Sequence, residues 1–151
     1  METVAILLRW LHILPAVAGG GATIFAAVAL VPTFSDLPES DRARMREAIM
    51  GRWRPIFAAC TALLLASGLM NFMLFQAPVH KGQPLYHALF GVKFLAATMV
   101  FFLGAALTGR SPALQRIRAR AAFWTSINAF LIVAIVMISG VLRGIPSIPA
   151  K

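Results

Sequence analysis

The residues best suited to chemistry in this 151-residue chain are basic groups inside long apolar stretches. Arg9, His12 and Lys93 lie in such stretches, which contain no Asp or Glu that could neutralise them. Unpaired cations are costly in lipid, so ionisable residues of membrane spans usually face a bundle interior or a cavity. We therefore expect these three side chains to meet an anionic group that the chain itself does not supply.

An imidazole with two cations nearby suits a flat, apolar macrocycle that carries a metal and acidic substituents. Histidine is a common axial ligand of haem iron, and Lys or Arg neutralises carboxylates through charge-assisted hydrogen bonds. We expect His12 to ligate the metal of a b-type haem or porphyrin, with Arg9 and Lys93 meeting its propionates. Asn71 and His87 are expected to line this site. The alternative role of Lys93 is to hold a substrate carboxylate.

The second axial position has several candidates. His87 lies six residues from Lys93, about 9 Å along a helix, so its pairing with His12 across one metal requires a tilt or a register shift. Four methionines are further candidates: Met70, Met73, Met99 and Met137. Methionine in an apolar helix is usually core filler.

Copper is the alternative metal. The same methionines, with His12 and His87, are soft or borderline ligands suited to Cu(I). Arg9 and Lys93 would repel a cation, however, and the sequence has no Cys-X-X-Cys pair because Cys60 is its one cysteine. The leading hypothesis is therefore haem or porphyrin binding, with copper handling as the runner-up. A third hypothesis is a non-catalytic subunit of a larger membrane complex.

Four apolar segments position these residues, at about 4–31, 55–77, 85–108 and 121–142. Each is longer than the ~20 residues that a helix needs to span hydrocarbon, and segments without strand-like alternation must span as helices. Hydrophobic residues make up 60% of the chain and charged residues 13%, whereas about a quarter of a soluble domain is charged. The sequence predicts one all-α domain over 1–151, an integral membrane four-helix bundle in contact with lipid.

Basic residues outside these segments predict the orientation. The loops 32–54 and 109–120 hold five and four arginines, nine of the fourteen Lys and Arg residues, and positively charged loops stay in the cytoplasm. We therefore expect an inner-membrane protein with both termini on the outer, periplasmic side. The net charge of +9 then reflects topology, not nucleic-acid binding, which uses a basic face of a soluble domain.

The first basic loop carries its own helix signals. Ser35, Asp36 and Pro38 offer helix-start chemistry, and residues 39–50 place acids early and arginines late, as the helix dipole favours. We expect a short cytoplasmic helix there, broken at Gly51 or Pro55 before the second span. In the loop between the second and third spans, His80 is expected to be solvated.

Counting along the spans places the basic residues at one level. The first and third spans run in the same direction, and His12 and Lys93 each lie eight residues from the start of their span, which is about 12 Å below the outer surface. Arg9 shares a face with His12, one turn closer to that surface. Small residues, above all Gly19-Gly20-Gly21, mark close helix packing, with room for a bulky ligand as the alternative.

Short motifs along the chain resemble the CopD-like membrane proteins. They are Leu8-Arg9-Trp10-Leu11-His12 before the three glycines, Gly51-Arg52-Trp53-Arg54-Pro55, Ser67-Gly68-Leu69-Met70-Asn71, and Tyr86 through Gly91-Val92-Lys93. This superfamily includes the copper resistance D domain and, more distantly, the HemJ-type protoporphyrinogen oxidases. In HemJ-like members the functional pair is a His of the first helix and a Lys of the third, and the resemblance places these roles on His12 and Lys93. It implies haem-linked oxidoreductase chemistry or copper passage, and a homodimer is compatible with either.

Overall fold

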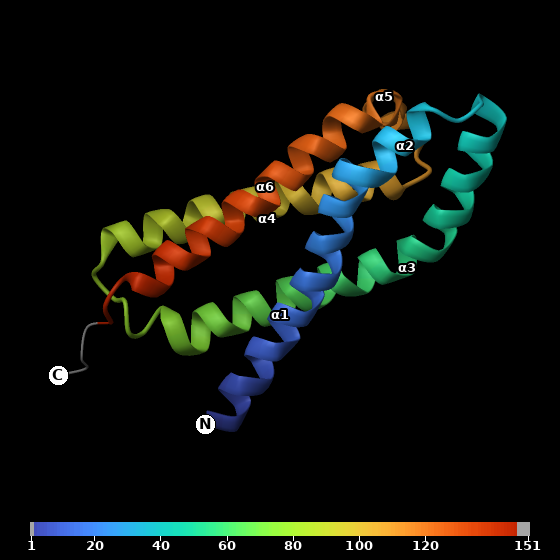
Figure 1. Ribbon diagram of the computed structural model, residues 1–151. Coiled ribbons are helices and arrows are strands. Elements are labelled where there is room, and N and C mark those ends of the chain that lie inside the picture. The colour runs from blue at the N-terminus through green and yellow to red at the C-terminus, as the bar shows by residue number, and fades with distance from the viewer. Residues whose placement is uncertain (1, 148–151) are drawn as a thin grey trace.

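The structure is a computed structural model that describes residues 2–147, and its regular secondary structure there is entirely helical. Four long helices dominate Figure 1: α1 (Glu2–Phe25), α3 (Glu39–Asn71), α4 (Pro84–Thr108) and α6 (Ala121–Gly144). Short segments extend or connect them: η1 (Ala26–Leu30), α2 (Val31–Ser35), η2 (Phe72–Gln76), η3 (Pro112–Leu114) and α5 (Gln115–Ala119). The prediction of an all-α chain is confirmed.

The helical stretches long and apolar enough to cross a bilayer are Glu2–Ser35, Glu39–Gln76, Pro84–Thr108 and Ala121–Gly144. Each of them overlaps one of the four predicted spans, so a multi-pass membrane protein is confirmed by length and composition. Only 11% of the most apolar window of each stretch is buried within the protein. The remaining apolar surface is suited to contact with lipid acyl chains.

The long helices associate as two pairs. α4 packs along α6 and α1 packs on α3, with smaller contacts between α1 and α6 and between α3 and α4. Figure 1 shows α4 and α6 side by side, whereas α1 crosses α3. The two ends of the described chain lie away from α2 and α5, which together mark the opposite end of the bundle. The membrane face on which each end lies stays a prediction.

Helix α3 differs from the predicted short helix that breaks at Gly51 or Pro55. It runs without interruption from Glu39 to Asn71, although its ribbon changes direction before the apolar part (Figure 1). Pro55 has no N–H to donate to the Gly51 carbonyl, and a proline inside a helix bends it. The predicted break was wrong because one missing hydrogen bond bends the helix without ending it.

Small residues allow α1 to lie between α3 and α6. A Cβ added to Gly19 would lie 3.7 Å from Cys60 Cβ, and one added to Gly20 would lie 3.2 Å from Ile132 Cγ2. Nothing lies within 4 Å of a Cβ added to Gly21. The packing interpretation of this glycine run therefore holds for its first two members, and Cys60 is buried at the contact with Gly19.

Helix α3 packs closely on α4 at Gly104. A Cβ added there would lie 2.3 Å from Cζ and 2.4 Å from Cε2 of Phe57. Real Cβ atoms do not tolerate such distances, so the Phe57 ring occupies the space that a side chain at position 104 would need. The neighbouring Leu103 is only 1% exposed, so the packing around this position leaves no room for a larger side chain.

We predict that Gly104→Ala destabilises the protein by about 1–3 kcal/mol, as overpacking of a filled core does. Thermal unfolding in detergent measures the effect. Gly91→Ala is the matched control on α4, because nothing lies within 4 Å of a Cβ at that position. When Phe57 is also replaced by Leu, Gly104→Ala should destabilise the protein less. Equal stability of Gly104→Ala and Gly91→Ala would contradict the proposed packing.

Candidate functional site

His12 lies on the side of α1 that packs against α3. Its Nδ1 is 3.0 Å from the Ser67 hydroxyl oxygen, and a Cβ added to Gly68 would lie only 3.0 Å from its Cε1. The missing side chain of Gly68 thus makes room for the edge of the imidazole. Ser67 and Gly68 on α3 thus meet the same edge of the His12 ring, Ser67 by a hydrogen bond to Nδ1 and Gly68 by close packing against Cε1.

The partners of Ser67 determine which nitrogen of His12 carries a proton. The single hydroxyl proton of Ser67 is directed to the Leu63 carbonyl, 2.5 Å from Oγ, so Oγ accepts from the imidazole. We infer from this network that Nδ1 of the neutral ring is protonated. Nε2 then carries the free lone pair, and within residues 2–147 it makes no side-chain hydrogen bond.

Lys93 lies close enough to the imidazole for its positive charge to act on His12. The side chain is half-buried on α4, and within the described residues neither Lys93 nor His12 takes part in a salt bridge. The site therefore combines contributions from α1, α3 and α4. It offers a nitrogen lone pair and an ammonium group whose charge no carboxylate of the described chain neutralises.

Two further residues expected at the site, Arg9 and Asn71, lie one helical turn from His12 and from Ser67, respectively. Arg9 is one turn from His12 on α1 and is exposed, and Asn71 is half-buried one turn beyond Ser67 on α3. Neither side chain is held by another residue of the described segment, 2–147. Both are available to a ligand, and their participation stays a prediction.

His87 and His80 belong to a polar cluster at the turn between η2 and α4. His80 is 4% exposed, stacks on Tyr86 with ring centroids 3.8 Å apart, and places Nδ1 2.8 Å from Gln83 Oε1. His87 Nε2 lies 3.1 Å from the His80 carbonyl, and its ring packs edge-on against Phe72. The expectation of a solvated His80 was wrong because the turn folds back onto α4. A role of His87 at the His12 site stays a prediction.

The soft ligands proposed for copper face outward. Their exposed fractions range from 45% to 68%, in the order Met70, Met99, Met73 and Met137. Among residues 2–147, no group of three or more His, Cys, Asp and Glu side chains is placed to hold a metal ion. Copper binding by these methionines stays a prediction.

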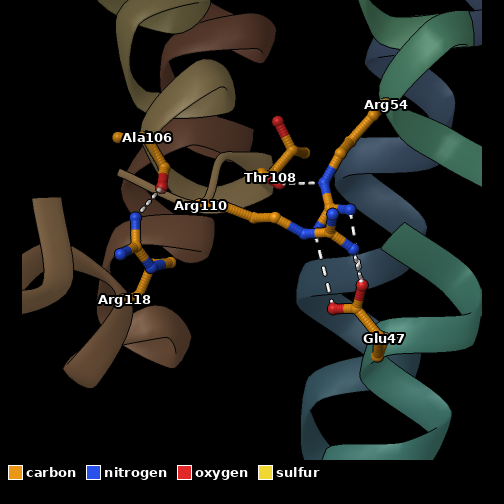
Figure 2. Close-up of polar contacts among 6 residues, drawn as sticks. All are labelled: Glu47, Arg54, Ala106, Thr108, Arg110 and Arg118. Atoms are coloured by element: carbon orange, nitrogen blue, oxygen red, sulfur yellow. Dashed lines mark hydrogen bonds and ion pairs between the residues drawn. The ribbon is translucent and has the colours of Figure 1, made fainter. Parts of the chain in front are cut away.

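A second polar cluster, centred on Glu47, connects α3 to the segment after α4 (Figure 2). The Glu47 carboxylate pairs with the Arg54 guanidinium, with both N···O distances 3.5 Å, and with the Arg110 guanidinium. The sequence did not predict that these arginines pair with Glu47. Glu47 could have indicated this ion pair, because it is one of only five acidic residues in the chain and lies seven residues, about two helical turns, before Arg54.

Two of the arginines also bind the end of α4. Arg54 Nε donates to the Thr108 carbonyl at 2.6 Å, and Arg118 Nη1 donates to the Ala106 carbonyl at 3.3 Å, as Figure 2 shows. The last carbonyls of a helix lack intrahelical partners and lie at the negative end of its dipole. Arg54 and Arg118 thus cap α4 from two different elements.

Comparison of the chain with known protein families, curated proteins and solved structures found no match to any of them. The resemblance to CopD-like proteins therefore stays a prediction that rests on the short motifs and on the positions of His12 and Lys93. The functional assignment has to come from the geometry of the site.

We predict that Ser67→Ala changes the tautomer of His12 without unfolding the bundle. In ¹⁵N-histidine-labelled protein, the wild-type His12 should show a protonated Nδ1, and the variant should lose this preference because its acceptor is gone. Ser139→Ala is the matched control, since its hydroxyl makes the same type of bond to the Ile135 carbonyl. A wild-type ring protonated at Nε2 would contradict the inferred network.

Proposed function

We propose that the protein binds a b-type haem or a related porphyrin between α1, α3 and α4, with His12 Nε2 as an axial ligand. The observation that carries this proposal is the chain of hydrogen bonds from His12 Nδ1 through Ser67 to the Leu63 carbonyl. Metal-bound histidines usually donate their other ring N–H to such an acceptor, which orients the ring and raises its basicity. The donor arrangement thus fits a metal at Nε2.

The charge of the site fits the acidic substituents of a tetrapyrrole. The Lys93 side chain on α4 is half-buried and has no carboxylate partner in the described chain. A propionate would neutralise this charge through a charge-assisted hydrogen bond. Arg9, one turn along α1, is the candidate for the second propionate, and Asn71 and His87 are proposed to line the site.

Bound haem would supply one-electron redox chemistry. The residues of the chain would hold and orient it, since Ser67 and Gly68 position the His12 ring and Lys93 anchors the acidic edge. The apolar surfaces of the surrounding helices would exclude water from the macrocycle. We further propose an inner-membrane location with the termini on the periplasmic side, and membership of the CopD-like superfamily, whose HemJ-type members have a functional His and Lys at the positions of His12 and Lys93.

We predict that the detergent-purified protein binds haem with a Soret band that shifts on ligation. His12→Ala should abolish the shift, because the axial nitrogen is gone. Lys93→Gln should keep the ligation spectrum and weaken binding about tenfold or more, as expected for loss of a charge-assisted bond of about 1.5–3 kcal/mol. Titration of the apoprotein with haem, followed by absorbance, measures both effects.

Lys81→Gln is the matched control for the loss of charge, because Lys81 is exposed in the turn before α4. It should bind haem as the wild type does. Wild-type protein that gives no ligated spectrum at excess haem would contradict the proposal. Colourless protein that binds stoichiometric Cu(I) in a His12-dependent manner would establish the copper alternative instead.

A further inference from the structure

A pocket of about 340 Å³ opens between the first part of α3 and the end of α4. Its charged lining consists of five arginines and two glutamates: Arg42, Arg46, Arg54, Arg110, Arg118, Glu39 and Glu47. Five guanidinium groups against two carboxylates leave three positive charges uncompensated within the lining. Because Arg54 lies thirteen residues before Ser67, this pocket is about 20 Å along α3 from the His12 site.

The two carboxylates do not satisfy all the guanidinium groups. Glu39 pairs with Arg42 at 3.3 Å, and Glu47 is shared by Arg54 and Arg110. The Nε of Arg42 is buried and has no partner within the described residues. Arg46 makes no ion pair within residues 2–147, so its guanidinium is available to an incoming anion.

The pocket lies at the level where two membrane spans begin or end. Arg54 directly precedes Pro55, where the apolar part of α3 starts, and Thr108 is the last residue of α4. At this level the phosphate groups of lipids lie in a bilayer. Basic pockets between transmembrane helices at this level are known to bind anionic lipid headgroups.

We propose that this pocket binds a phosphate group, either that of an anionic lipid headgroup or that of a soluble phosphate ester. Guanidinium groups bind phosphate oxygens in a bidentate fork and remain charged at any physiological pH. The volume of about 340 Å³ exceeds that of a phosphate ion and leaves room for a glycerol-sized substituent. Bound phosphate would neutralise the excess charge and tie the first part of α3 to the end of α4.

The test is thermal unfolding of the full chain in neutral detergent at constant ionic strength. Separate samples receive phosphatidylglycerol, phosphatidylcholine, glycerol 3-phosphate or inorganic phosphate. We predict that phosphate in at least one anionic form raises the unfolding midpoint by about 3 °C or more, whereas phosphatidylcholine does not. A response to phosphatidylglycerol alone identifies a lipid as the source of the phosphate group. A response to glycerol 3-phosphate or to inorganic phosphate identifies a soluble phosphate.

Variants locate the effect in the pocket. Arg46→Gln should lose most of the upward shift, while Arg52→Gln, which removes the same charge from α3 outside the lining, should keep it. In Glu47→Gln, the ligand concentration that gives half of the maximal shift should be lower than in the wild type. The reason is that the variant lacks the carboxylate that competes with phosphate for Arg54 and Arg110. Equal responses of Arg46→Gln and Arg52→Gln, or no response of the wild type to any phosphate, would overturn the proposal.

Discussion

The arrangement of the bundle depends on the close approach of α3 to both α1 and α4. Inside lipid there is no hydrophobic force between helices, so association relies on small residues and interhelical hydrogen bonds. Gly68 admits the His12 ring, and Gly104 admits the Phe57 ring. A polar interaction accompanies each contact. Ser67 hydrogen-bonds to His12 next to Gly68, and Arg54 donates to the Thr108 carbonyl at the end of α4. The Gly104 contact links the pairs α1–α3 and α4–α6 through α3, and the packing of Gly20 against Ile132 links them through α1.

These contacts also separate two basic sites of different character. At one, a neutral imidazole and the Lys93 ammonium face no carboxylate in the described chain, which suits a metal-bearing ligand with acidic edges. At the other, arginines bind carbonyls, Glu47 and the end of α4, and retain excess positive charge. The first is proposed as the functional site and the second as a phosphate site, and both follow from cations that the chain itself leaves unpaired.

The sequence predicted the spans well because length and hydropathy determine them directly. The pairing of His12 with Ser67 was not predicted, because the mostly apolar spans contain too few polar residues to define how one helix is rotated against another. The continuity of α3 through Pro55 and the burial of His80 depend on neighbouring helices, which local propensity does not include. Glu47 pairs with Arg110, which lies 63 residues away in sequence, so this ion pair depends on the packing of distant segments.

Haem binding at the proposed site requires a free Nε2 of His12 that reaches the bound metal. Pulsed electron paramagnetic resonance of ferric haem-reconstituted protein, labelled with ¹⁵N-histidine, tests this claim most directly, because the chain has only three histidines. We predict a strong ¹⁵N coupling to the iron that persists when His80 and His87 are replaced by glutamine. A spectrum without ¹⁵N coupling, or one whose coupling disappears in that double variant, would contradict the account.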